Sequence, residues 1–339
     1  MPHTLGLSQS TNTQTGVPAG ALGWSGDGAP RDGALRSFAV GAVIQHMPKT
    51  LNRVEGTDFR LPTSSELDAL EAFQLSLGRS TTPIVNGPGA LEFDDPDVTA
   101  GQALFHGMPS QNGRGRFCSF CHSGGGALNA SGQNDQRATG AERSPRAPAC
   151  AYPVAPGDGA FGLTPVRTDD RSTFCTNGAT GPVVFRGDQS FSVPSTIEAA
   201  DTAPFFHNNS ADTLEEVVDF YRSTVFSRSI SGASNAFVIT DTQRDQVAAF
   251  MRALNVLENI RAATASIDSL RVLNRLRNIA DAQQQVRDAI RVLGQGNIKL
   301  DRGTPDLLPA LRQASLKLLA GQTAAARADL EVARGLIAN

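Results

Sequence analysis

The pentapeptide Cys118-Ser119-Phe120-Cys121-His122 constrains this 339-residue chain more than any other segment does. It is a C-x-x-C-H motif, in which two thiols at fixed spacing stand directly before an imidazole. Thiols at this spacing add to the two vinyl groups of one haem and become thioethers, and the adjacent histidine then ligates the iron. The motif therefore predicts one covalent haem c, bound by Cys118 and Cys121, with His122 as the proximal iron ligand.

Three other interpretations of the motif remain open. A thioredoxin-like redox pair would need a preceding strand in a βαβ pattern, whereas Val98 and Phe105 stand at helical spacing before the motif. A zinc site would need a second C-x-x-C or a histidine pair, whereas Cys150 and Cys175 are single and far apart. The third alternative is an incidental match. The context favours covalent haem.

Cys150 and Cys175 lie in a long stretch of low periodicity, residues 123–190, which we interpret as an insertion. In an oxidising compartment these two cysteines would most simply form a disulfide. Covalent haem is attached after export, so we expect a periplasmic or other extracytoplasmic location. Residues 1–6 do not resemble a signal peptide, and we therefore expect that the N-terminus is truncated.

Composition and periodicity predict a mainly α protein. The net charge of −3, without a basic block, predicts neither a nucleic-acid nor an anionic-membrane partner, and no apolar run is long enough for a membrane span. Helices are expected within 34–55, after Thr63, from about Asp97, after Thr213 and from about Asp241. From 257 onward the chain is rich in Ala, Leu, Arg and Gln, which predicts three or four helices broken at 294–296, at 303–305 and at Gly321.

The helix expected after Thr213 is amphipathic. Leu214, Val218 and Tyr221 fall on one stripe, together with Val217 and Val225, so Tyr221 should point inward. Glu215 is expected on the surface of this helix, along with Glu216, Asp219 and Arg222. In the C-terminal helices, Leu307, Leu311 and Leu318 are expected to form core.

Three separated segments resemble the C-terminal haem domain of the bacterial di-haem cytochrome c peroxidase and MauG family. They are Val193-Pro194-Ser195-Thr196, Thr202-Ala203-Pro204-Phe205-Phe206-His207-Asn208-Asn209-Ser210 and Thr213-Leu214-Glu215-Glu216-Val217-Val218-Asp219-Phe220-Tyr221. The resemblance covers about 97–256. It implies a remnant of an N-terminal cytochrome c-like domain (1–92), a class I cytochrome c-like helical domain with a long loop insertion (93–256), and a C-terminal helical bundle or hairpin pair (257–339).

The second axial ligand of the iron has several candidates. In the family it lies fourteen positions after the histidine of the "FHDG"-like segment and is Met in the peroxidases and Tyr in MauG. The resemblance thus implies Tyr221 as the distal ligand and His207 as a residue near the haem that does not ligate iron. A tyrosine ligand stabilises ferric iron. The other candidates are Met1, His3, His106, Met108 and Met251.

The resemblance implies a c-type cytochrome that exchanges single electrons with a protein partner. Trp24, in a segment similar to a family stretch whose Trp lies between two haems, is the candidate electron relay. The alternative function is a peroxidase or MauG-like oxidoreductase acting on hydrogen peroxide, which would need a second haem that this chain does not encode. Family members carry their first C-x-x-C-H upstream of the Trp24 segment, so the resemblance implies either that the chain begins inside the first haem domain, which we favour, or that this haem has been lost. The region around His46-Met47 has no Glu where the peroxidases carry an acidic active-site residue, so no catalytic residue is assigned. The helices of 257–339 fit a packed bundle and, equally, a docking module.

Overall fold

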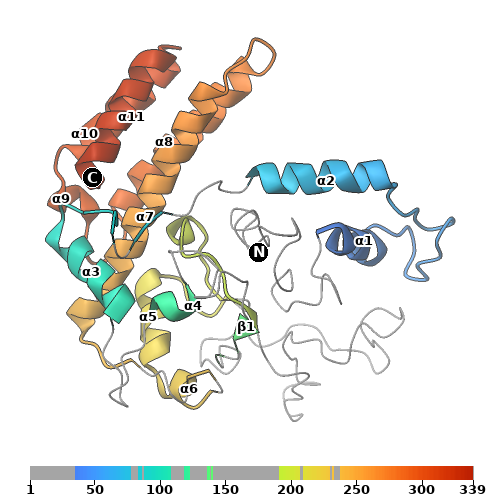
Figure 1. The fold of residues 1–339 in the computed structure, drawn as a ribbon, viewed down its shortest axis with the longest axis horizontal. Coiled ribbons are helices and arrows are strands. Elements are labelled where there is room, and N and C mark those ends of the chain that lie inside the picture. The colour runs from blue at the N-terminus through green and yellow to red at the C-terminus, as the bar shows by residue number, and fades with distance from the viewer. Residues whose placement is uncertain are drawn as a thin grey trace.

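The computed structural model describes residues 35–77, 83–85, 88–107, 118–122, 136–137, 139, 191–206, 209–229, 231–232 and 237–338. Within these ranges the chain is mainly α-helical, as predicted (Figure 1). None of these helices combines the length and the apolar character that a membrane span requires. The helices are α1 (Leu35–His46), α2 (Ser64–Leu77), α3 (Pro96–Gly107), α4 (Cys118–Cys121), η4 (Ala199–Asp201), α5 (Leu214–Arg222), α6 (Thr224–Ser227), α7 (Asp241–Asp268), α8 (Arg275–Leu293), α9 (Leu300–Gly303), α10 (Leu307–Leu319) and α11 (Thr323–Ile337).

Two short strands are also described. They are β1 (Gln136–Arg137) and β2 (Phe191–Ser192), which pair antiparallel with Gln136 opposite Ser192. The pairing joins a residue on the C-terminal side of the motif to the segment that leads into Pro194.

Helix α7, with 28 residues, is the longest of the described helices. It contributes to the hydrophobic core along most of its length. It begins at Asp241, as expected, because Thr240 and Gln243 form a capping box. The first half of α7 packs on α3 and α5, and the second half packs on α8 and α11 (Figure 1). The predicted domain boundary at 256/257 falls inside α7, and the buried residues on both sides belong to one continuous hydrophobic core.

Helices α3 and α7 approach each other closely at Gly101. A Cβ atom at this position would lie 1.9 Å from the carbonyl oxygen of Gln246 and 3.0 Å from Cβ of Phe250. Phe250 makes aromatic contacts with Phe93 and Phe105, with ring centroids 5.8 Å and 5.3 Å apart. The absence of a side chain at Gly101 therefore allows the aromatic side chains of both helices to interlock.

The C-terminal helices form a packed layer beside α7. Leu307, Leu311 and Leu318 on α10 are fully buried, which confirms that their stripe forms core. The predicted breaks are also observed, since α8 ends before Gly294, α9 ends at Gly303 and α10 and α11 are separated at Gly321. Helices α7 and α8 form one hairpin and α10 and α11 form a second (Figure 1).

Helices α1 and α2 pack on each other around a small cluster. Leu35 is buried against Phe38 and Leu75. Thr63 and Glu66 form the predicted capping box before α2, because each backbone N–H is bonded to the other's side chain. Helix α1 ends at His46, so the helix expected within 34–55 is shorter than that range.

The α3–α7 contact predicts a position-dependent effect of adding a methyl group. Gly101→Ala should lower the free energy of unfolding by about 1–3 kcal/mol, because the new Cβ must displace the α7 backbone. Gly107→Ala, on the same helix with nothing within 4 Å of its Cβ, is the matched control and should change it by less than about 0.5 kcal/mol. Urea denaturation measures both, and equal stabilities of the two variants would contradict the close approach.

Candidate functional site

The C-x-x-C-H residues form a single helical turn. Cys118 to Cys121 make up α4, and the backbone N–H of His122 donates to the carbonyl of Cys118 over 2.8 Å. This turn packs on α3, and Cys118 lies against the hydrophobic core. The three residues predicted from the motif are therefore held together at the edge of the core.

The ring of His122 is oriented by the backbone of Pro194. Its Nδ1 lies 2.9 Å from the Pro194 carbonyl oxygen. Because a carbonyl can only accept, the neutral ring must carry its proton on Nδ1, which leaves a lone pair on Nε2. Burial lowers the pKa of His122 to about 4, despite an opposing contribution from the Pro194 carbonyl. At neutral pH the imidazole is uncharged and its Nε2 can ligate a metal.

The described residues around the motif show neither the lowered pKa of a reactive thiol at Cys118 nor a group of zinc ligands. Cys118 and Cys121 do not form a disulfide. Burial, and then the neighbouring Cys121, raise the pKa of Cys118 to about 12, whereas a reactive thiol needs a lowered pKa. In the described parts of the chain no three His, Cys, Asp or Glu side chains are grouped to bind a metal ion. No strand precedes the motif in these parts either, since the preceding element is α3.

Tyr221 is placed on the last turn of α5 inside a shell of phenylalanines. The predicted inward direction is confirmed, because the ring packs against the core. The centroids of Phe226, Phe220, Phe237 and Phe206 lie 4.9, 5.4, 6.1 and 6.3 Å from that of Tyr221. This shell holds the tyrosine ring in one orientation in an apolar environment.

The Tyr221 hydroxyl and the thiols of the motif interact electrostatically. Burial raises the pKa of Tyr221 above its usual range, and interactions with Cys121 and Cys118 raise it further, so the hydroxyl lies within electrostatic reach of both thiols. Val225 also packs against the core, as expected, but it lies on α6 rather than on the same helix, because the extended Ser223 ends α5.

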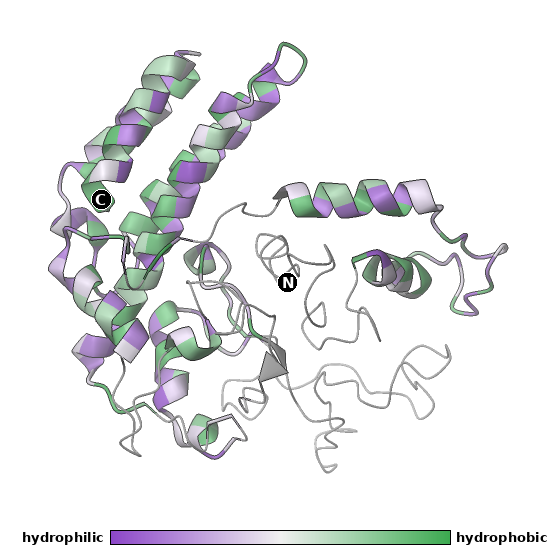
Figure 2. Cartoon of the chain, in the orientation of Figure 1, coloured by the Kyte–Doolittle hydropathy of each residue, from purple (hydrophilic) through white to green (hydrophobic). Residues whose placement is uncertain are grey.

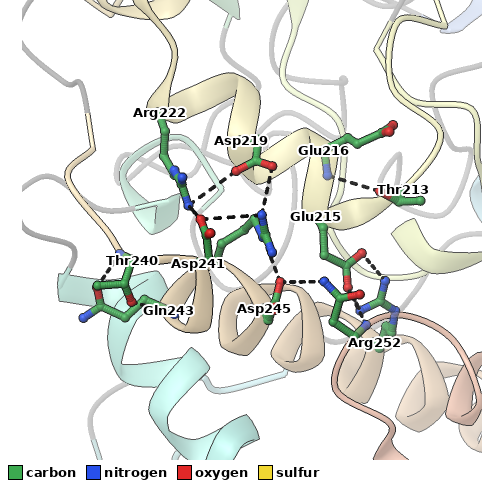
Figure 3. Close-up of polar contacts among 12 residues, drawn as sticks. Thr213, Glu215, Glu216, Asp219, Arg222, Thr240, Asp241, Gln243, Asp245 and Arg252 are labelled. Carbon is green, nitrogen blue, oxygen red and sulfur yellow. Dashed lines mark hydrogen bonds and ion pairs between the residues drawn. The ribbon is translucent and has the colours of Figure 1, made fainter.

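Glu215 is buried, contrary to the expectation that it lies on the helix surface. Its carboxylate accepts two hydrogen bonds from Arg252 on α7, of 2.8 and 2.7 Å, and one from the Asn297 backbone of 3.1 Å (Figure 3). Burial raises the pKa of Glu215, but Arg252 outweighs it and the net pKa lies below its usual range. At Gly296 a Cβ would lie 2.1 Å from the Arg252 guanidinium, so this glycine makes room for the ion pair.

A second set of charges joins α5 to the start of α7. Arg222 donates to Asp241 over 2.8 Å, and Arg244 contacts both Asp219 over 3.2 Å and Asp245 over 2.8 Å (Figure 3). These groups are partly exposed, so each pair contributes little by itself. Together with Glu215 they fix the α5 helix, and hence Tyr221, relative to α7.

Most of the remaining candidate residues do not lie in the described part of the site. Trp24, His207, Cys150 and Cys175 lie outside the described residues. Met251 is buried in the core, where packing accounts for it. Other iron-ligand candidates, Met1, His3 and Met108, also lie outside the described residues.

His106 lies at the end of α3. Burial lowers its pKa, opposed by a hydrogen bond with the Val85 backbone. Its Nε2 is buried without a hydrogen-bond partner among the described residues.

Two features of the site have no clear signal in the sequence. Pro194 was identified only as part of a family-like segment, because a carbonyl acceptor leaves no side-chain signature. The phenylalanine shell is made of residues from several segments within about sixteen positions of Tyr221. Their aromatic character was the one feature in the sequence that could have indicated the shell.

Comparisons with known proteins add no relative. No protein-family model matches the chain, no curated protein is significantly similar to it, and no solved structure matches its fold.

The buried ion pair predicts a pH-dependent loss of stability. Glu215→Gln should lower the free energy of unfolding by about 3–5 kcal/mol at pH 7, because it leaves the Arg252 charge buried without a counter-ion. The carboxylate has a lowered pKa, so its contribution is present above the unfolded pKa and is lost as pH falls through the folded pKa. Urea denaturation should therefore show the gap between wild type and variant narrowing below about pH 5.

Glu331→Gln on α11 is the control, because it removes only an exposed pair with Arg327. It should cost about 0–1 kcal/mol at any pH. A Glu215→Gln variant as stable as this control would show that the pair does not anchor α5.

Proposed function

We propose that this chain is a c-type cytochrome that binds one haem covalently and transfers single electrons. The observation that carries the proposal is the hydrogen bond between Nδ1 of His122 and the Pro194 carbonyl. A ligating histidine characteristically donates its other ring N–H to such an acceptor, which fixes the tautomer and the ring orientation. The bond directs the Nε2 lone pair of a neutral imidazole away from the backbone, as a proximal iron ligand requires.

The other residues of the site also fit this cofactor. Cys118 and Cys121 form no disulfide and lie one helical turn apart, and the raised pKa of Cys118 keeps that thiol protonated at neutral pH. A thiol S–H can add across a vinyl double bond without an oxidant. His122 would then ligate the iron. When bound, the haem supplies an iron centre that cycles between the ferric and ferrous states.

The position of Tyr221 supports its proposed role as the second iron ligand. Its hydroxyl lies within electrostatic reach of both thiols, and the phenylalanine shell packs against its ring. As an anionic ligand it would stabilise ferric iron and lower the reduction potential. Together with the family-like segments, the placement of α3, α4, α5 and α7 supports a class I cytochrome c-like domain of the di-haem peroxidase and MauG family. The proposal includes a periplasmic location and an electron-transfer protein as partner.

Removal of the motif thiols tests the proposal. The chain is produced behind a secretion leader in a bacterial host that attaches haem c, and covalent haem is measured by absorbance after denaturation. Cys118→Ala/Cys121→Ala should lose covalent haem, whereas the control Cys150→Ala/Cys175→Ala should retain it. Wild-type protein without covalent haem, or a motif variant that keeps it, would refute the assignment. Iron analysis should give one iron per chain, and two would favour the peroxidase alternative.

Removal of a single hydroxyl tests the second ligand. Tyr221→Phe should change the ferric haem spectrum and raise the reduction potential, because the ligand that stabilises ferric iron is lost. Tyr152→Phe, the only other tyrosine in the chain, is the matched control. Spectra and potentials that do not differ between Tyr221→Phe and wild type would mean that Tyr221 only packs.

A further inference from the structure

The turn that joins α7 to α8 exposes three aliphatic side chains at one point. Val272 and Leu276 are 95% and 84% exposed, and Leu273 is fully exposed. Single exposed aliphatic residues are common, but a group of neighbouring exposed aliphatic side chains indicates an interaction site. We call residues 269–277 the hairpin tip.

The hairpin tip is held in shape by its own hydrogen bonds. The Asn274 side chain accepts from the Arg271 backbone N–H over 2.9 Å, and the Asn274 N–H donates to the Arg271 carbonyl over 3.2 Å. At its base, Asn278 donates to the Ser266 carbonyl and the Ser269 hydroxyl. The aliphatic side chains are thus presented to water by an ordered turn.

Arginines surround these side chains. Arg271, Arg275 and Arg277 are exposed, and the sequence from 269 to 280 contains no Asp or Glu. Among the described residues, Arg271 and Arg275 have no acidic partner, and Arg277 has only a long, exposed contact of 3.8 Å with Asp281. The net charge of −3 conceals this local concentration of positive charge.

The shape of the hairpin tip favours a lipid surface over a protein surface. Figure 1 shows the α7–α8 hairpin projecting away from α3, α4 and α5, with its turn at the far end, and Figure 2 shows hydrophobic residues in this turn beside hydrophilic ones at the start of α8. A stable protein interface buries about 800 Å² on each partner, more than three side chains on a convex turn provide. Lipid, in contrast, can surround each inserted side chain.

We infer that the hairpin tip binds the surface of an anionic membrane. Val272, Leu273 and Leu276 would insert between the headgroups, and the three arginines would bind lipid phosphates. The rest of the protein would remain in water, with the C-x-x-C-H site at the opposite end of α7. This inference does not depend on the haem.

Vesicle co-sedimentation of the full chain tests the inference. Wild type should bind vesicles of phosphatidylglycerol and phosphatidylcholine, bind pure phosphatidylcholine at least about tenfold more weakly, and dissociate at high salt. Val272→Ser/Leu273→Ser/Leu276→Ser should bind the anionic vesicles at least about tenfold more weakly. Arg271→Gln/Arg275→Gln/Arg277→Gln should lose the preference for anionic lipid and the salt dependence.

Val332→Ser on α11 removes an aliphatic side chain that is exposed elsewhere and should leave binding unchanged. Circular dichroism should show wild-type helix content in every variant, because the substituted side chains make few internal contacts. Absence of wild-type binding, or equal binding by wild type and the tip variants, would overturn the inference. So would a concentration-dependent dimer that only the aliphatic tip variant loses, because the partner would then be a second copy of the chain.

Discussion

The packing of α3 against α7 is the contact on which the rest of the described structure depends. Gly101 lets the two backbones approach, and Phe250 then fills the space between Phe93 and Phe105. Because α4 follows α3 and packs on it, this contact also determines where the C-x-x-C-H turn lies. Helix α5, which carries Tyr221, is positioned against the same stretch of α7 by the Glu215–Arg252 pair.

Electrostatics and shape have different roles at the site. The neutral state of His122 and the protonated states of Cys118 and Tyr221 all follow from burial, since each charged form would lose its hydration. The orientation of each ring is set by fixed neighbouring groups. The Pro194 carbonyl orients the imidazole of His122, and the phenylalanine shell orients the phenol of Tyr221.

Features encoded within a few residues could be predicted from the sequence. The caps at Thr63 and Thr213, the helix start at Asp241 and the buried stripe of Leu307 each depend on local spacing, and the structure confirms them. The burial of Glu215 could not be predicted in the same way, because its partner Arg252 is remote in sequence. Neither could the Pro194 contact, which uses a backbone atom.

The continuity of α7 across the predicted domain boundary could have been predicted from the sequence. No Gly or Pro interrupts 241–268, so one uninterrupted helix was compatible with the sequence at 256/257. The composition changes near 257, in the middle of α7, where the helix passes from packing on α3 and α5 to packing on α8 and α11. The cytochrome c-like fold, the haem and the second ligand remain proposals that rest on residue chemistry and resemblance.

The continuity of α7 has a consequence for how the protein loses its structure. Two regions that share a helix and one hydrophobic core cannot melt independently, because unfolding either region exposes apolar surface of the other. The Asn297 backbone adds to this coupling, since it binds the same carboxylate that positions α5. The described helices from α3 to α11 thus form one cooperative unit, in which a ligand bound near α4 raises the melting temperature of the C-terminal helices as well.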